Sequence, residues 1–76
     1  MKILFKDSRG KKFTLNVEGS MKIEQVKLKV KNEIKSTKTI RLLFGGDVMK
    51  DGDNLDDYEV EDLNEITYTE EYQSGI

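Results

Sequence analysis

Hydrophobic and polar residues alternate in residues 2–7 and again in residues 12–17. The apolar members of the two stretches are Ile3 and Phe5, then Phe13, Leu15 and Val17. A period of two is typical of strands that bury one face. The polar residues 7–10 separate the stretches and end in Gly10, which can adopt a positive φ. The pattern therefore predicts a β-hairpin whose two apolar faces are in phase.

The hydrophobic period changes in the next part of the chain. Its apolar positions are spaced three, four and four residues apart, at Ile23, Val26, Val30 and Ile34. This spacing predicts an amphipathic helix that buries one stripe. Ser20 is the candidate N-cap of this helix. Leu28 lies off the stripe, so we expect it to be exposed.

The pattern becomes extended again at residues 40–43, where Ile40 and Leu42 share one face. The elements predicted after them are a turn at 45–47, a short strand at 48–49, a turn at 50–53, a compact loop around Leu55 and Tyr58, and a last strand at 66–69. Strands grouped around one helix indicate an α+β domain with the helix on one sheet face. We expect the buried core to comprise Ile3, Phe5, Phe13, Leu15, Val17, Ile23, Val26, Val30, Ile40, Leu42, Met49, Leu55, Val60, Ile66 and Tyr68.

Composition excludes several classes of active site. The chain has 76 residues, enough for one domain, and contains no Cys and no His. Thiol nucleophiles, Cys/His zinc sites and Ser-His-Asp triads are therefore excluded. Residues 51–57 are rich in Asp, but Leu55 and Asp56 occupy the positions where a calcium-binding EF-hand loop needs an oxygen ligand and a Gly. We expect no enzymatic activity, no metal and no cofactor.

Charge is divided unevenly along the chain, although its net value is only −2. Residues 1–38 carry +7, whereas residues 39–76 carry −9. Because both halves share one small core, we expect the charges to interleave over the folded surface. A nucleic-acid binder would need exposed aromatic residues among its cations, and these are lacking. We therefore expect no nucleic-acid partner.

Nothing in the sequence indicates a membrane protein. Apolar runs are four residues or shorter, too short for a membrane span. The first six residues are too short and too charged for a secretory signal. We expect a soluble monomer in the cytoplasm, the nucleus or both, with no membrane partner.

An ordered set of short matches resembles the ubiquitin family. The matching residues are Met1–Ile3, Lys6, Gly10, Lys11, Thr14, Leu15, Val17, Glu18, Ser20, Ile23–Lys27, Arg41–Phe44, Gly46, Asp51, Gly52, Leu55, Asp57 and Tyr58. The resemblance covers residues 1 to about 69, with a gap of one residue near Ser36. It implies a β-grasp fold, in which one helix packs across a mixed sheet of four to five strands. It also implies a ubiquitin-like domain of residues 1–70 and a flexible C-terminal tail of residues 71–76.

The C-terminal tail departs from the family pattern. Family members that are conjugated end in a glycine pair, preceded by an arginine that the activating enzyme recognises. Here Glu71 stands at the position of that arginine, Ser74 replaces the first glycine, and Ile76 extends beyond Gly75. The resemblance therefore implies that the ubiquitin activating enzyme does not recognise the chain as written. Gly75 is the candidate conjugation terminus if the chain is trimmed.

The partner-binding patch of the family also changes. The resemblance places Ser8, Leu43, Thr67 and Thr69 at the four positions of this patch, and only Leu43 is apolar. Arg41 and Gly46 adjoin Leu43 and complete the candidate patch. Because binding hot spots need a desolvated apolar centre, we expect ubiquitin-recognising motifs to bind weakly. Lysines that match the family's chain-forming lysines are Lys6, Lys11, Lys27 and Lys29.

The leading hypothesis is a non-catalytic ubiquitin-like domain that binds other proteins and is not conjugated by the ubiquitin machinery. A second hypothesis is a divergent modifier, activated after trimming to Gly75. A third is a ubiquitin-like segment of a precursor, released or ligated by a neighbouring self-processing domain. The sequence alone leaves these alternatives open.

Overall fold

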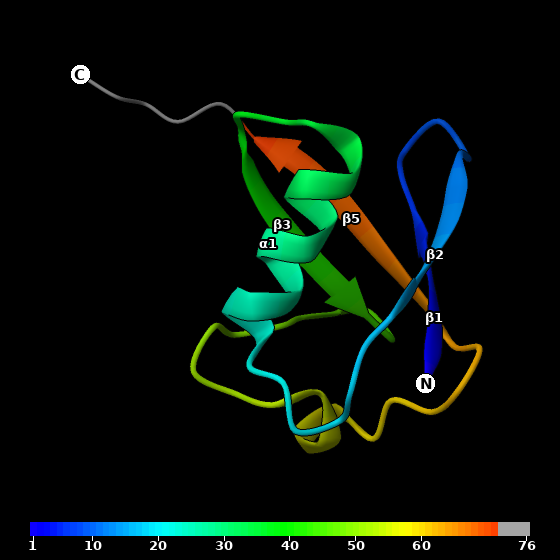
Figure 1. Cartoon of the computed structure of the whole chain (residues 1–76), viewed down its shortest axis with the longest axis vertical. Coiled ribbons are helices and arrows are strands. Elements are labelled where there is room, and N and C mark those ends of the chain that lie inside the picture. The colour runs from blue at the N-terminus through cyan, green and yellow to red at the C-terminus, as the bar shows by residue number, and fades with distance from the viewer. Residues whose placement is uncertain (72–76) are drawn as a thin grey trace.

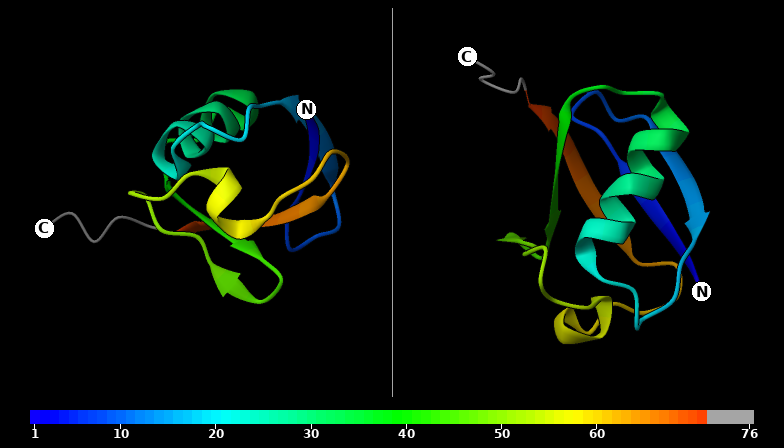
Figure 2. Two further views of the ribbon diagram at one scale, coloured as in Figure 1. Left: turned by 90° about the horizontal axis from the view of Figure 1, so that it is seen from below. Right: turned by 60° about the vertical axis from the view of Figure 1, so that its left-hand side comes forward.

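A computed structural model describes residues 1–71. The chain forms a sheet of five strands with one helix packed across a single face (Figures 1 and 2). The elements are, in order, β1 (Lys2–Lys6), β2 (Lys12–Asn16), α1 (Ile23–Ile34), β3 (Thr39–Phe44), β4 (Asp47–Val48), the short 3-10 helix η1 (Leu55–Tyr58) and β5 (Glu65–Glu71). Strand order is β2-β1-β5-β3-β4, with β1 and β5 parallel and the other pairs antiparallel. The mixed sheet with its single helix is the predicted β-grasp fold.

The predicted hairpin is confirmed, with Phe5 and Phe13 as directly paired residues of β1 and β2. Asp7 stabilises its turn, although the sequence placed this residue in a polar loop. It is only 7% exposed, and its Oδ1 accepts hydrogen bonds from the backbone N–H groups of Arg9 and Lys11, both at 2.9 Å. Burial raises the pKa of Asp7, but these hydrogen bonds and the Arg9 guanidinium outweigh it, so the pKa lies below the usual 3.8.

The helix begins and ends with backbone arrangements that the sequence did not predict. Lys22 is the N-cap, so the expectation for Ser20 is wrong. The Gln25 side chain accepts a hydrogen bond from the Lys22 backbone N–H at 3.0 Å, while the N–H of Ile23 donates to the carbonyl of Asp53. These partners satisfy two N–H groups at the start of the helix that have no acceptor within it. At the other end, Lys35 adopts the left-handed conformation common after helices.

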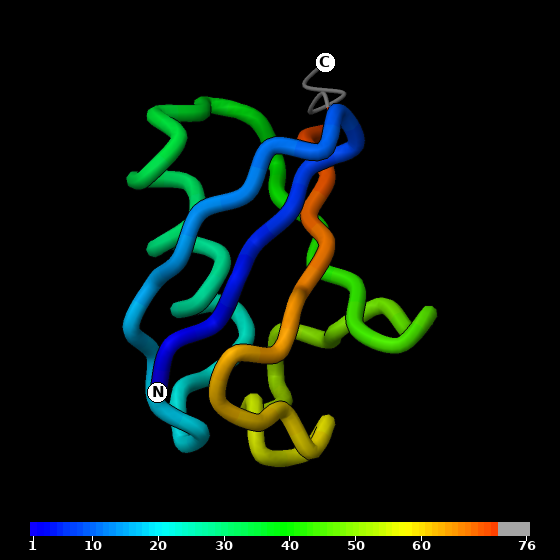
Figure 3. Tube along the Cα trace, turned by 90° about the vertical axis from the view of Figure 1, so that its right-hand side faces the viewer, coloured from blue at the N-terminus to red at the C-terminus, as the bar shows by residue number. Residues whose placement is uncertain are grey.

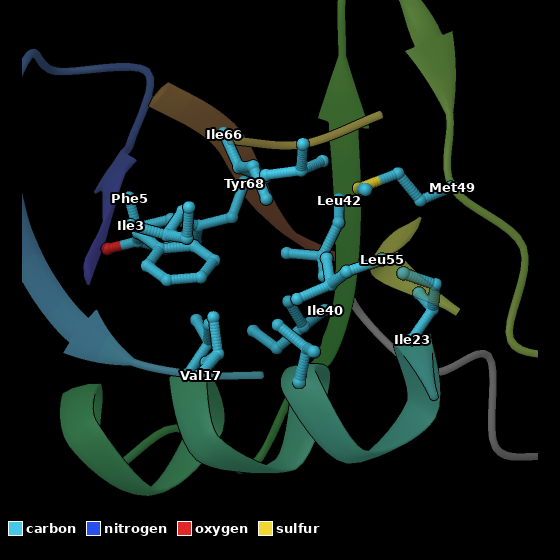
Figure 4. Close-up of a cluster of buried hydrophobic side chains, with 13 residues drawn as sticks. Ile3, Phe5, Val17, Ile23, Ile40, Leu42, Met49, Leu55, Ile66 and Tyr68 are labelled. Carbon is cyan, nitrogen blue, oxygen red and sulfur yellow. The ribbon is translucent and has the colours of Figure 1, made fainter. Parts of the chain in front are cut away.

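The core lies between α1 and the sheet, and Figure 4 shows most of its side chains. Thirteen of the fifteen residues expected there are buried. The exceptions are Phe13 and Leu15, which are only partly buried because β2 is an edge strand with no neighbour beyond it. Leu28 is 59% exposed, as predicted from its place off the helical stripe. The helix in this described part of the chain is neither long nor apolar enough to cross a membrane.

Candidate partner-binding surface

The candidate surface is the sheet face that points away from α1. Cα pairing aligns Lys6, Thr67 and Leu43 in one row across β1, β5 and β3. Arg41 and Thr69 form the adjacent pair. Because side chains alternate along a strand, the four residues Arg41, Leu43, Thr67 and Thr69 share this outer face. The structure therefore brings together the four strand residues of the patch implied by the family resemblance.

The other two predicted residues lie in turns at its margin. Gly46 is in the turn between β3 and β4, with a φ of 87°, and Gly45 before it has a φ of 61°. Two successive positive φ angles define a tight hairpin turn that glycine adopts without strain. Ser8 is exposed in the β1–β2 turn, where it lines a shallow hollow together with Thr69.

Val48 is a surface residue that the sequence analysis did not assign to the patch. It is 48% exposed, and its Cα pairs directly with that of Leu43. Leu43 and Val48 therefore form a cross-strand apolar pair on the outer face. The two-glycine turn is a signal that could have found it, because a two-residue turn between Phe44 and Asp47 fixes the next pair as Leu43 and Val48. We call the pair and its neighbours Arg41, Gly46 and Thr67 the Leu43–Val48 patch.

Two ion pairs flank this patch on the same face. Lys12 Nζ lies 3.1 Å from a Glu65 carboxylate oxygen, and the pair crosses over β1, which separates their strands. Arg41 Nε lies 2.8 Å from a carboxylate oxygen of Glu71. By contrast, no acidic side chain among residues 1–71 lies within ion-pair distance of Lys6. Lys6, which pairs with Thr67 of the patch, is therefore a cation on this face that no acidic side chain of the described residues neutralises.

The candidate chain-forming lysines are not equivalent. Lys11 and Lys29 are exposed, whereas Lys6 and Lys27 are partly buried. Lys27 Nζ also lies 2.6 Å from a carboxylate oxygen of Asp51, and its side chain is only 24% exposed. An ion-paired, partly covered amine is a poorer nucleophile than a free one. Among the four lysines, the geometry therefore makes Lys27 the least favoured acceptor.

The C-terminal end of β5 bears on the conjugation hypothesis. Glu71 is still part of the strand, paired with Thr39, one residue beyond the domain boundary expected at residue 70. The tail residues Ser74, Gly75 and Ile76 lie outside the described residues. The candidate conjugation terminus at Gly75 therefore stays a prediction from the sequence.

The described residues contain no side-chain cluster typical of a metal site. No group of three or more acidic side chains within residues 1–71 is placed to hold a metal ion. Two tyrosines have shifted pKa values. A hydrogen bond to Asp53 raises the pKa of Tyr58 above 10, and burial, followed by the charge of Asp7, raises that of Tyr68. Both tyrosines are therefore neutral near pH 7.

A family comparison agrees with this architecture. The sequence model of the ubiquitin family matches residues 3–69, which is most of the chain. The chain belongs to the ubiquitin family. Proteins of this family are generally not enzymes.

Proposed function

We propose that this ubiquitin-family chain is a non-catalytic protein-interaction domain that binds through the Leu43–Val48 patch. The observation that carries the proposal is the cross-strand pair of the half-buried Leu43 and the exposed Val48, on the outer sheet face near the β4 edge. An apolar pair that a partner can cover is the minimal hot spot of a weak interface. Lys6 beside it favours a partner with acidic residues.

The partner best suited to this patch is an amphipathic helix that presents one or two small apolar residues with acidic neighbours. This face offers less apolar surface than the family pattern, because Thr67 and Thr69 occupy two of the four family positions. We therefore expect affinities about tenfold to a hundredfold below those of ubiquitin, equivalent to about 1–3 kcal/mol of lost contacts. Glu71, at the position where the family has an arginine, and Ile76 after Gly75 support a domain that the ubiquitin machinery does not conjugate.

NMR titration with a peptide of a helical ubiquitin-binding motif tests the proposal. We expect chemical-shift changes centred on Leu43, Val48 and Thr67. Leu43→Ala and Val48→Ala should each weaken binding several-fold. Leu28→Ala is the matched control, because Leu28 is an exposed leucine on the opposite side of the molecule. Shifts elsewhere, or affinity equal to that of ubiquitin, would contradict the proposal.

A further inference from the structure

Strand β3 has a free edge at its start. On one side, residues 39–43 pair with β5. On the other side, β4 pairs only with the last two residues of β3. Among the described residues, no strand therefore lies beside residues 39–41 on the side away from β5 (Figure 2). This part of β3 is an open sheet edge, to which a further strand can add.

The open edge leaves two backbone groups of Ile40 unpaired. The Met49 N–H donates to the carbonyl of Leu42 at 2.9 Å, so the backbone groups of Leu42 point away from β5. Ile40 precedes Leu42 by two residues, and its N–H and C=O therefore point to the same side. No donor or acceptor among residues 1–71 pairs with either group. Because Ile40 is only 3% exposed and buried backbone groups are almost always hydrogen-bonded, this place favours a ligand with its own donor and acceptor.

A groove between α1 and β3 adjoins this edge. It has a volume of about 360 Å³, and Thr39 and Ile40 form its β3 side. Its helix side includes Glu24, Leu28 and Lys31, whose spacing of four and three residues places them on one helix face. Leu28 is 59% exposed and is the apolar centre of this face. A water molecule has a share of about 30 Å³ in the liquid, so the groove has room for a peptide segment as well as for a bridging water.

The charges that line the groove give it a direction. Lys27 and Asp51 neutralise each other through their ion pair. Lys31 lies in the last turn of α1, and only residues 35–38 connect this helix to β3, across the end of the domain where β5 also ends (Figure 3). Lys31 is therefore at the end of the groove beside the start of β3, and Glu24 is at the other end. No acidic side chain among residues 1–71 is within ion-pair distance of Lys31, so an acidic ligand residue is favoured there.

We propose that this groove binds an extended segment of a partner protein, which adds a short antiparallel strand to the free edge of β3. One apolar residue of the segment exchanges both backbone hydrogen bonds with Ile40. Its side chain lies on the same sheet face as that of Ile40 and packs against Leu28. The residue two positions later lies on this face too, and an acidic side chain there meets Lys31. Met49 already occupies the place beside Leu42, so the segment enters the sheet only at Ile40.

NMR titration of the full chain with a short peptide tests strand addition. The probe is a blocked six-residue peptide with valine third, glutamate fifth, and serine or threonine elsewhere. We expect shift changes at the Ile40 amide and the Leu28 methyl groups, and slower hydrogen exchange of the Ile40 N–H. Because the edge offers few hydrogen bonds, the Kd should be in the millimolar range. No shift at 10 mM peptide, or shifts confined to other parts of the chain, would overturn the proposal.

Methylation of single peptide nitrogens tests the backbone hydrogen bonds. N-methylation of the valine removes the N–H that would donate to the Ile40 carbonyl and leaves every charge and side chain in place. It should weaken binding at least about fivefold, because a buried acceptor loses its donor. N-methylation of the next residue is the matched control, since its N–H points away from β3, and it should have little effect. Equal effects of the two methylations would refute the strand geometry.

Two substitutions in the chain test the side-chain contacts. Leu28→Ala should weaken peptide binding about threefold to tenfold through lost apolar contact. Lys31→Gln should abolish the preference for glutamate over glutamine at the fifth peptide position, and a preference that persists would contradict the assigned direction. Leu43→Ala is the control, because it alters only the Leu43–Val48 patch. Unchanged binding to this variant separates a failure here from a failure of the proposed function, whereas equal effects of Leu28→Ala and Leu43→Ala would refute the assigned site.

Discussion

The guanidinium of Arg41 lies 2.8 Å from a carboxylate oxygen of Glu71, across the outer faces of β3 and β5. The antiparallel pairing creates this contact, because Arg41 pairs with Thr69 and Glu71 is the next residue of β5 on the same face. Both side chains are more than 40% exposed, so the ion pair contributes little to stability. Its main effect is on charge, because it neutralises the arginine beside Leu43.

Neutralising Glu71 should strengthen partner binding. Glu71→Gln leaves Arg41 without its carboxylate, so the cation can attract an acidic residue of the partner. We expect the affinity for an acidic helical peptide to rise by about twofold to fivefold at low salt, an effect that salt should remove. Titration calorimetry measures it. Glu65→Gln, which breaks the ion pair with Lys12 on the far side of β1, is the control and should have a smaller effect. An unchanged or weaker affinity for Glu71→Gln would show that Arg41 does not contribute.

Packing of α1 against the sheet should depend strongly on Val26. This side chain is fully buried at the centre of the helical stripe. Val26→Ala leaves a cavity, so we expect the free energy of unfolding to fall by about 1–3 kcal/mol. Denaturant unfolding measures the change, and Leu28→Ala on the exposed face should change it by less than about 0.5 kcal/mol. Equal midpoints for Val26→Ala and the original chain would contradict this packing.

The core could be predicted from the sequence because two patterns each define a buried face. Hydrophobic residues recur at every second position in the strands, and they form one stripe along the helix. Phe13 and Leu15 are less buried than expected because β2 lies at the sheet edge. The hydrophobic pattern of a strand does not show its position in the sheet. Strand order depends on long-range pairing that local periodicity does not encode. The parallel pairing of β1 with β5 is of this kind.

The candidate surface was predicted less completely than the core. Leu43 and Thr67 could be assigned from the family resemblance, and the structure places them directly opposite each other. Val48 was missed because its face depends on the register set by the two-glycine turn. Asp7 was missed because a polar residue in a loop gives no sign of burial until its hydrogen-bond partners are known.

Asp7 should make stability sensitive to acid. The pKa of Asp7 is lowered on folding from the usual 3.8. The ionised carboxylate therefore contributes fully to the free energy of unfolding above pH 3.8 or so, and this contribution is lost as the pH falls through the lower pKa of the folded state. Asp7→Asn keeps an oxygen for the two backbone N–H groups but loses the charge facing Arg9. We expect the variant to be less stable than the original chain at pH 6 and the difference to shrink toward pH 2. Thermal unfolding measured across this range tests the sign. A difference that is constant or grows in acid would contradict it.

Conjugation should fail for reasons that are independent of one another. Ile76 blocks the glycine carboxylate that adenylation needs, and Ser74 adds bulk where the family has a glycine. Glu71 presents the opposite charge to the arginine that the activating enzyme recognises, and it is engaged by Arg41. A reversed charge in a recognition site costs several kcal/mol, a loss that trimming does not repair. We therefore expect no thioester with the ubiquitin activating enzyme, either for the full chain or for a chain ending at Gly75.

Partial activity should return only when both defects are repaired in the shortened chain. The variant that ends at Gly75 and carries Glu71→Arg and Ser74→Gly restores the arginine and the glycine pair together. Either substitution alone should leave one obstacle in place and give no product. The measurement is a non-reducing gel after incubation with activating enzyme and ATP, with ubiquitin as the positive control. A thiol-sensitive adduct formed by the unmodified chain, or by the trimmed chain alone, would favour the modifier hypothesis over a non-conjugated interaction domain. Because Glu71→Arg also removes the carboxylate that pairs with Arg41, the repaired chain should lose the ion pair on the outer face, which a small decrease in thermal stability would report.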